Sequence, residues 1–508
     1  MPALRRLSPI LLALFIAGCG TSGPIHTDAP AASADEARFT ILQMNDVYEI
    51  TPVEGGRAGG LARVATLERR LQAEGVPVVT VLAGDFFSPS ALGTARVDGE
   101  RLAGRQMVAV LNTLGLDVAA LGNHEFDVSE EAFRARLTES TFPYVSANVA
   151  PASGVPFPRV VPRLVLPLAL APGDTLRVGF TSVVIPSTPK PYVVYAEPLP
   201  TLAAEVARLD PEADLEIGLT HLAFADDATA AATIPALDLV LGGHEHENVR
   251  AYRGPRQVPV LKADANARTV YVHRLTVDRR TGAVRVDSEL VPITEALPDD
   301  PAVAAEVARW VEVASAGFRA DGFEPDRIAT VTTEDLDGRE GTVRTRPARL
   351  GRTIAEAFRA AAGGDAAGVR VGLFNSGSVR VDDVLPAGPF SEYDAIRVLP
   401  FGGTVVTVQM PGALLARVLD QGVANVGTGG FLQTAGVARD ATGWTVSGTP
   451  LDPAALYTVA TSDFLVSGRE TGLDYLNAET NPDVTLVGRH GDVRRALIDQ
   501  LVAVYGAP

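Results

Sequence analysis

The sequence is poor in lysine, cysteine and tryptophan. Only two lysines, Lys190 and Lys262, occur among 44 basic residues, so arginine supplies nearly all the positive charge. The 61 acidic residues outnumber the basic ones and give a formal net charge of -17. This balance excludes a protein whose whole surface attracts nucleic acid. Arginine, in turn, suits bidentate contacts with phosphate and carboxylate groups.

The single cysteine, Cys19, excludes an internal disulfide and marks a processing signal instead. Arg5 and Arg6 precede a short apolar run at 10–17, and Gly18 and Cys19 follow it. This run is too short to span a bilayer as a helix, and the pattern is that of a secretory signal. Ile-Ala-Gly-Cys resembles the bacterial lipoprotein processing box. We therefore expect residues 1–19 to be a lipoprotein signal, whose cleavage leaves Cys19 as the new, lipidated N-terminus. An ordinary secretion signal is the alternative.

A chain of 508 residues with 46% hydrophobic residues is long enough for two independent cores. Residues 20–37 are small, polar and rich in proline and alanine, which predicts a flexible tether. The patterning predicts a first domain at 38–297, a linking helix within 298–325 and a second domain at 326–508. In the first domain, 270–293 is expected to form a β-hairpin in which His273 is structural rather than a ligand.

The first domain alternates short apolar strands with amphipathic helices. Leu61, Val64, Leu67 and Leu71 fall on one helical face, and a similar pattern recurs at 107–114. Strand-like runs occupy 38–44, 77–83, 117–121, 178–184, 215–220 and 237–241. This alternation predicts a layered α/β fold with substantial parallel pairing.

Side chains typical of metal ligands follow five of these strands. Because sites in open α/β sheets form beyond the carboxyl ends of the strands, we expect them at one edge of one sheet. Four of the seven histidines belong to this set. Its members are Asp46, Asp85, Asn123, His124, Asp127, His221, His244 and His246.

This set of residues suits a pair of divalent metal ions. Asp85 is the natural bridging carboxylate, and imidazoles with further carboxylates suit zinc, manganese, iron or cobalt. Two such metals activate water and stabilise the phosphoryl oxygens during displacement. His124, oriented by Asp127, fits the role of stabilising or protonating the leaving oxygen.

Asp46, Gly84-Asp85, the GNHEFD segment at 122–127, His221 and the GGHEH segment at 242–246 resemble the calcineurin-like metallophosphoesterases. Their order and spacing are similar to the branch that contains 5′-nucleotidases and UDP-sugar hydrolases. The resemblance implies an α/β/β/α sandwich. It also implies one metal on Asp46, Asp85 and His246, a second on Asp85, Asn123, His221 and His244, and a catalytic dyad of His124 and Asp127.

Tyr48 departs from the family pattern, because the first motif of the family is Asp-x-His and here it is Asp46-Val47-Tyr48. A neutral tyrosine is a poor ligand, since its pKa is near 10. Three interpretations stay open: a phenolate ligand, a hydrogen-bond donor behind the ligands, or a side chain that points into the core. We expect a weakened or altered first metal site.

The second half resembles the C-terminal domain of the same 5′-nucleotidase family. The resemblance rests on NSGSVR at 375–380, LPFGG at 399–403 and SDFLVSG at 462–468. It implies an α/β substrate-binding domain in which Phe401 and Phe464 stack on a base. Glu470 replaces the aspartate of the family, and Ser378 replaces a glycine. The substrate-binding residues implied are Arg344, Arg346, Asn375, Arg380, Phe401, Phe464 and Glu470.

The sequence therefore predicts an ester-bond hydrolase, a 5′-nucleotidase-like phosphomonoesterase that uses two divalent metals on extracytoplasmic nucleotides. Alternatives on the same site are a 2′,3′-cyclic phosphodiesterase with 3′-nucleotidase activity, a UDP-sugar diphosphatase and an esterase for a sulfur-containing ester. A non-catalytic nucleotide-binding lipoprotein is an alternative of another class. We expect a periplasmic or cell-surface lipoprotein. Its lipid anchor is expected in the outer membrane, where the source cell has an outer membrane. We expect no nucleic-acid polymer and no obligate protein partner.

Overall fold

The computed structural model describes residues 35–187 and 189–508. The predicted signal peptide and Cys19 lie outside the described residues, as does most of the predicted tether. The tether was predicted to extend to 37, but β1 (Glu36–Met44) already begins at Glu36. Its last two residues are instead strand, because they pair with the antiparallel strand β16 (Thr269–Asp278). No helix of the described residues is long and apolar enough to cross a membrane.

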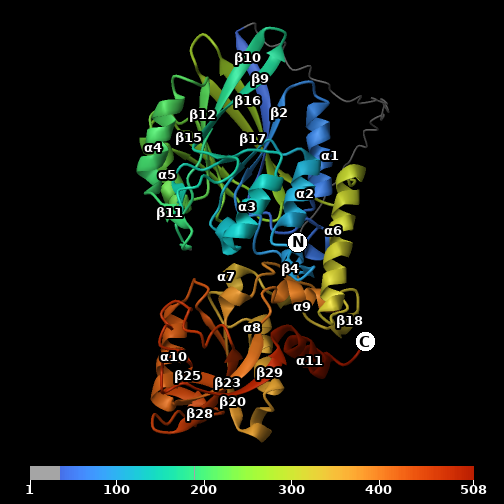
Figure 1. Cartoon of the computed structure of the whole chain (residues 1–508), viewed down its shortest axis with the longest axis vertical. Coiled ribbons are helices and arrows are strands. Elements are labelled where there is room, and N and C mark those ends of the chain that lie inside the picture. The colour runs from blue at the N-terminus through green and yellow to red at the C-terminus, as the bar shows by residue number, and fades with distance from the viewer. Residues whose placement is uncertain (1–34, 188) are drawn as a thin grey trace, which may run out of the picture.

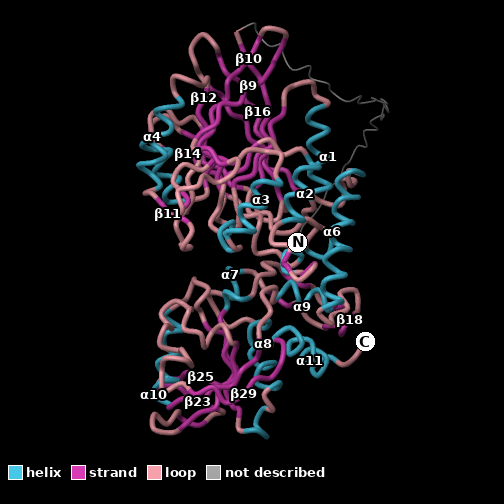
Figure 2. The backbone as a smooth tube through the Cα atoms, in the orientation of Figure 1, coloured by secondary structure: helices cyan, strands magenta, loops and turns pink. Residues whose placement is uncertain are grey.

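The first domain is a sandwich of two sheets covered by helices on both outer faces (Figures 1 and 2). A seven-stranded sheet has the order β17-β16-β1-β2-β5-β6-β8, and a six-stranded sheet has the order β14-β15-β13-β12-β10-β9. The additional strands of the first sheet are β2 (Val78–Ala83), β5 (Val118–Ala120), β6 (Tyr144–Val145), β8 (Val160–Val161) and β17 (Val284–Pro292). Those of the second are β9 (Arg163–Ala171), β10 (Asp174–Thr181), β12 (Leu215–Thr220), β13 (Leu239–Gly242), β14 (Val249–Arg253) and β15 (Val258–Lys262).

Buried side chains fill the space between the two sheets and fix their face-to-face packing. Ile41 of β1, Val81 of β2, Ile217 of β12 and Leu241 of β13 belong to one apolar cluster and are fully buried. Because neighbouring side chains of a strand point to opposite faces, the remaining apolar residues meet the covering helices. These are α1 (Leu61–Gln72), α2 (Arg105–Leu114) and α3 (Glu130–Glu139) on one side, and α4 (Pro198–Leu209) and α5 (Phe224–Thr233) on the other.

The predicted hairpin and linking helix are both present. β16 and β17 pair antiparallel, and His273 is buried between Ser288 and Gln43, with ring nitrogens 2.8 and 2.9 Å from their oxygens. Burial, with Arg250 nearby, lowers the pKa of His273 to about 3. His273 is therefore a neutral, structural residue. The linking helix is α6 (Pro301–Ala320), which packs along α1 and α2.

The second domain is built on a five-stranded sheet with the order β24-β20-β28-β23-β29. Helices α8 (Arg349–Ala361) and α11 (Val493–Tyr505) pack on one side, and α10 (Gly412–Ala424) packs on the other. Two short helices, α7 (Glu340–Val343) and α9 (Glu392–Val398), lie toward the first domain (Figure 1). The strands are β20 (Val369–Asn375), β23 (Thr404–Pro411), β24 (Leu432–Ala435), β28 (Leu456–Ser462) and β29 (Thr485–Asp492).

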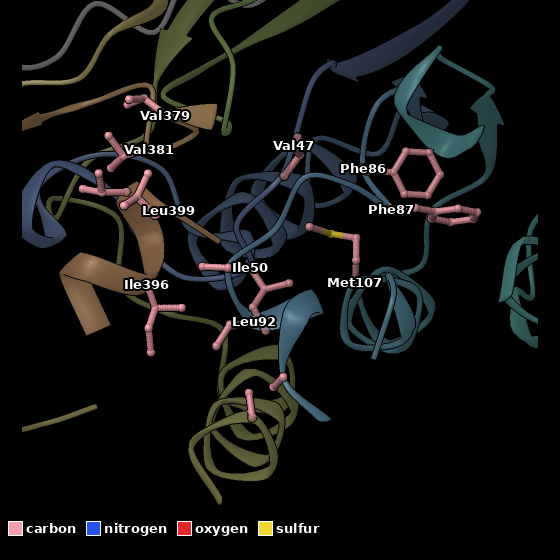
Figure 3. Close-up of a cluster of buried hydrophobic side chains, with 14 of the residues drawn as sticks. Val47, Ile50, Phe86, Phe87, Leu92, Met107, Val379, Val381, Ile396 and Leu399 are labelled. Atoms are coloured by element: carbon pink, nitrogen blue, oxygen red, sulfur yellow. The ribbon is translucent and has the colours of Figure 1, made fainter. Parts of the chain in front are cut away.

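One continuous apolar cluster joins the two domains. Ile50 and Leu92 of the first domain lie in it together with Val381, Ile396 and Leu399 of the second (Figure 3). All five side chains are buried. The domains therefore share a core rather than only a polar contact surface.

Substitution of Ile50 by alanine should lower the free energy of unfolding by about 2–5 kcal/mol, because a buried aliphatic side chain is replaced by a cavity. Ile50 is 1% exposed, whereas Val155 is 60% exposed and serves as the control. Val155→Ala should unfold at nearly the wild-type denaturant concentration. Equal stability of the two variants in denaturant titrations would contradict the shared core.

Candidate active site

The predicted ligand residues lie together, but they come from two sheets rather than one. Asp46, Asp85 and Asn123 follow β1, β2 and β5 of the seven-stranded sheet, whereas His221 and His244 follow β12 and β13 of the six-stranded sheet. The expectation of a single sheet edge was therefore wrong. Both sheets end at the same place because they pack face to face, so their carboxyl ends form one site.

Asp46, Asp85 and His221 form the centre of the site. One ligand atom from each lies within 4.8 Å of the others, and all three side chains are buried. Nε2 of His221 lies 3.2 Å from Oδ2 of Asp85 and 4.0 Å from Oδ1 of Asp46. Nε2 of His246 lies 3.9 Å from the same Oδ1 of Asp46. This spacing brings carboxylate and imidazole ligands to one point.

Oδ1 of Asn123 is buried at this point and lacks a hydrogen-bond partner among the described residues, and Nε2 of His221 approaches Asp85 at 3.2 Å without good hydrogen-bond geometry. Buried polar atoms are seldom left unpaired, because an unmade hydrogen bond costs about 1–3 kcal/mol. Carboxylate, amide and imidazole donors suit zinc, manganese, iron or cobalt. The residues present therefore fit bound metal ions.

The electrostatics of the site follow from burial and from the charges packed together. Burial alone would lower the pKa of His221, but Asp85 and Asp46 raise it to about 10. Burial would raise the pKa of Asp85, but His221 and His124 hold it below its usual range. Burial, helped by the positive charge of His221, lowers the pKa of His244 to about 4. Bound cations would stabilise the two carboxylates and require the imidazoles to be neutral.

The backbone is strained where it presents these residues. Asp46, Asp85 and His244 have φ angles of 53°, 59° and 84°, a region that side-chain-bearing residues seldom adopt. Such strain gathers at functional sites, where surrounding structure enforces it. Gly84 shows how tight the site is, because a Cβ there would lie 2.6 Å from the backbone nitrogen of Gly122.

Glu125 is a residue of the site that sequence reasoning did not assign. Its buried carboxylate accepts hydrogen bonds from the backbone nitrogens of Asp85 and Phe86, at 2.8 and 2.6 Å, and from those of Phe87 and Gly122, at 3.1 and 2.5 Å. Glu125 thus holds the Asp85 loop against the loop that precedes His124. The signal available was its place within GNHEFD, between two residues already assigned a role.

Lys262 performs a similar task at the other sheet. Its buried ammonium group donates to the backbone oxygens of Leu222 and Gly243, at 2.7 and 2.8 Å. It also pairs with Asp227 at 2.8 Å and with Glu245. Lys262 therefore joins the loops that carry His221 and His244. The rarity of lysine was visible in the sequence, but this role was not.

Tyr48 points into the site rather than into the core. Its hydroxyl lies 3.1 Å from Oδ2 of Asp85 and 3.0 Å from Nε2 of His246. Burial, together with Asp85 and Asp46, raises the pKa of Tyr48 well above its usual value. Tyr48 therefore directs a protonated hydroxyl group, which donates to Asp85, at the predicted metal ligands.

His124 and Asp127 form the predicted dyad. Nδ1 of His124 lies 2.6 Å from Oδ2 of Asp127, and Lys190 lies 3.5 Å from the other carboxylate oxygen. Burial would raise the pKa of Asp127, but its hydrogen bond with His124 and the nearby Lys190 and Arg380 lower it. Nδ1 of His124 is thus held by Asp127, while Nε2 faces the second domain, where Nη2 of Arg380 lies 3.4 Å from it.

The second domain brings only some of its predicted residues close to the ligand cluster. Arg380 reaches His124, and Glu340, which was not predicted, accepts hydrogen bonds from Arg380 at 3.3 Å and from Arg344. Arg346 is exposed. Arg380 and Arg344 thus meet at Glu340, whose carboxylate lies 4.0 Å from Nδ1 of His246.

The residues predicted to bind the organic group of the substrate comprise a hydrogen-bonded polar group and two exposed phenylalanines. Nδ2 of Asn375 donates to Oε2 of Glu470 at 2.8 Å, and Oγ of Ser378 donates to Oδ1 of Asn375 at 3.0 Å. The residues Phe401 and Phe464 are 43% and 36% exposed. Both rings are therefore accessible for stacking, and their contact with a base stays a prediction.

Two family models match consecutive parts of the chain. The calcineurin-like phosphoesterase model matches residues 39–248, and the 5′-nucleotidase C-terminal domain model matches residues 327–477. The first match contains every predicted metal-ligand residue. The second contains every predicted substrate-binding residue.

Relatives and solved structures agree with these matches. The chain is 28% identical to human 5′-nucleotidase over 451 residues, which cover 80% of this chain and 76% of the human protein. A 5′-nucleotidase precursor from Thermus thermophilus has a TM-score of 0.75 at 22% identity and covers 92% of this chain and 97% of its own. A sulfate thiohydrolase from Thermus thermophilus has a TM-score of 0.67 at 18% identity, with 94% and 95% covered. The last two likenesses show the fold alone.

The ligand cluster beside a histidine–aspartate dyad, the order of the two domains and the matches to both parts agree. The chain belongs to the 5′-nucleotidase family and is a hydrolase, with a calcineurin-like phosphoesterase domain followed by a 5′-nucleotidase C-terminal domain.

Proposed function

We propose that the protein is a two-metal phosphomonoesterase that releases phosphate from nucleotides outside the cytoplasm. Nucleotide phosphoester hydrolysis follows from the family. The observation that carries the finer proposal is the proximity of three groups: the buried ligand cluster, the His124–Asp127 dyad and Arg380 of the second domain. These supply metal binding, acid–base chemistry and anion recognition at one point.

Residues from both sheets would hold the metals. Asp46, Asp85 and His246 would hold the first, beside the hydroxyl of Tyr48. The second would lie among Asp85, Asn123, His221 and His244. When bound, the metals supply activated water and stabilise the charge on the phosphoryl oxygens.

The side chains of the protein position the substrate and handle the proton of the leaving group. Asp127 holds Nδ1 of His124, which directs Nε2 toward the phosphoryl group and supports its action on the leaving oxygen. Arg380 and Arg344 present guanidinium groups that suit phosphate oxygens. Phe401 and Phe464 offer exposed rings to a base, since every base has a face on which an aromatic ring can stack.

Other substrates keep the same ligand cluster and change the organic group. A 2′,3′-cyclic phosphodiesterase with 3′-nucleotidase activity, a UDP-sugar diphosphatase and an esterase for a sulfur-containing ester remain alternatives. Tyr48, Ser378 and Glu470 are the positions at which these would differ from a 5′-nucleotidase, and the last two both contact Asn375. Against a non-catalytic binding protein, every predicted ligand other than the histidine that Tyr48 replaces is present, and Glu125 and Lys262 hold the loops that carry them.

We also propose export and lipid attachment through Cys19. The basic start, the short apolar run and the cysteine at the processing point support it. Dephosphorylation outside the cytoplasm would make nucleosides available for uptake, since charged nucleotides do not readily cross membranes.

The activity is tested on residues 35–508 stripped of metal and supplied with manganese, zinc, cobalt or iron in turn. We expect metal-dependent phosphate release from AMP, in preference to 3′-AMP, 2′,3′-cyclic AMP, UDP-glucose and an aryl phosphate. His124→Ala should lose at least about 100-fold in kcat, because one acid–base group contributes about that factor. Nucleotide binding without turnover under any metal would contradict the proposal.

Substitution of Tyr48 by histidine should tighten divalent metal binding at the first site, because a neutral imidazole coordinates more readily than a protonated phenol. Tyr48→Phe is the matched control and should bind as the wild type does. Calorimetric titration with Mn²⁺ measures both. Loss of metal in Tyr48→Phe would contradict this and identify Tyr48 as a phenolate ligand.

Substitution of Cys19 by alanine should abolish incorporation of radiolabelled palmitate into the full-length protein expressed in a bacterium. The only thiol of the chain is then absent. Membrane fractionation with and without the substitution gives a second measurement. Palmitate labelling that persists in Cys19→Ala would exclude the proposed lipidation site.

A further inference from the structure

His246 follows a strand of the first domain, but its ring is oriented by the second. Nδ1 of His246 lies 2.8 Å from Oδ2 of Asp382, a residue 136 positions along the chain. The other carboxylate recorded near this nitrogen in the described part of the chain is Glu340, at 4.0 Å, also from the second domain. Nε2, on the opposite side of the ring, faces Tyr48 and Asp46.

Asp382 is held firmly in this position. Its backbone oxygen accepts a hydrogen bond from Arg268 of the first domain at 2.6 Å. Its other carboxylate oxygen accepts one from the backbone nitrogen of Glu340 at 2.9 Å. Its φ of 38° lies in the left-handed region, which costs energy for a residue with a side chain. Contacts from both domains thus maintain a strained conformation that points the carboxylate at His246.

A carboxylate on the second nitrogen of a ligand histidine fixes its tautomer and direction. With the proton held on Nδ1, the lone pair of Nε2 is directed at the metal, and the basicity of the imidazole rises. In the first domain alone, this histidine would have to find another acceptor or rotate. The first metal site is therefore complete only when the second domain is docked.

We propose that Asp382 is a positioning residue of the metal centre, through which docking of the second domain strengthens metal binding at His246. This inference rests on the proposed function, because it concerns the same ligand cluster. Coupling between two equilibria is reciprocal, so metal binding at His246 must equally favour the docked arrangement of the domains.

The neighbouring Asp383 separates this role from a general effect on the interface. Its carboxylate accepts a hydrogen bond from the backbone nitrogen of Glu54 at 3.0 Å and contacts Arg397 at 3.3 Å and Arg268 at 3.8 Å. Asp383 therefore crosses the same interface without contacting His246. Asp383→Ala is the matched control for Asp382→Ala.

The first experiment measures metal binding to residues 35–508 by calorimetric titration with Mn²⁺, checked by metal analysis after dialysis. Asp382→Ala should weaken the His246 site by about 10–100-fold, the usual effect of removing such a partner. The remaining site and the affinity of Asp383→Ala should stay near the wild type. Wild-type affinity in Asp382→Ala, or an equal loss in Asp383→Ala, would overturn the proposal.

A double substitution tests whether Asp382 acts through His246. In a His246→Ala background, Asp382→Ala should cause no further loss of metal affinity, because the histidine that it positions is absent. A further loss of the same size would overturn the proposal. Circular-dichroism melting curves for each variant identify any that fails to fold.

Small-angle X-ray scattering tests the reciprocal effect. Mn²⁺ should reduce the radius of gyration of the wild type and of Asp383→Ala, with a smaller change in Asp382→Ala. An identical response in all three would overturn the coupling. Neither binding nor scattering uses a substrate, so the coupling can stand even where no nucleotide is hydrolysed, and it can fail in an active enzyme.

Discussion

The close packing of the two sheets, with their carboxyl ends at the same level, is the constraint on which the site depends. Neither sheet alone carries enough ligands, since Asp85 follows one and His221 follows the other. Two buried polar side chains keep the loops in register. Glu125 collects four backbone N–H groups on one side, and Lys262 joins the two histidine loops on the other. Each side chain satisfies the backbone polar groups of the loops that carry the predicted ligands. Those loops are therefore held in place without a bound metal.

Much of this arrangement could be predicted from the sequence. Alternating apolar strands and helices indicated the α/β layers, and ligands at strand ends indicated the site. The division into two sheets could not be predicted from the pattern, because hydrophobic runs report burial and not which sheet a strand joins. Asp382 and Glu340 were missed for a related reason. Single acidic residues far along the chain carry no local signal, and only the docking of the domains gives them a role.

Tyr48 shows how one replacement changes several contacts. Its hydroxyl approaches both Asp85 and His246, and His246 is itself held from behind by Asp382. A chain of contacts therefore runs from Asp85 of the first domain to Asp382, a strained residue of the second. A metal bound at His246 would therefore be affected by Tyr48 and Asp382 together, so the identity of residue 48 alone does not determine how that metal is held.

The apolar cluster shared by the domains has a thermal consequence. Separation of the domains would transfer Ile50, Val381 and Leu399 from a buried environment into water. Exposure of apolar surface raises the heat capacity, and near room temperature its free-energy cost is mainly entropic. The apolar contribution to docking of the two domains therefore strengthens on warming from the cold.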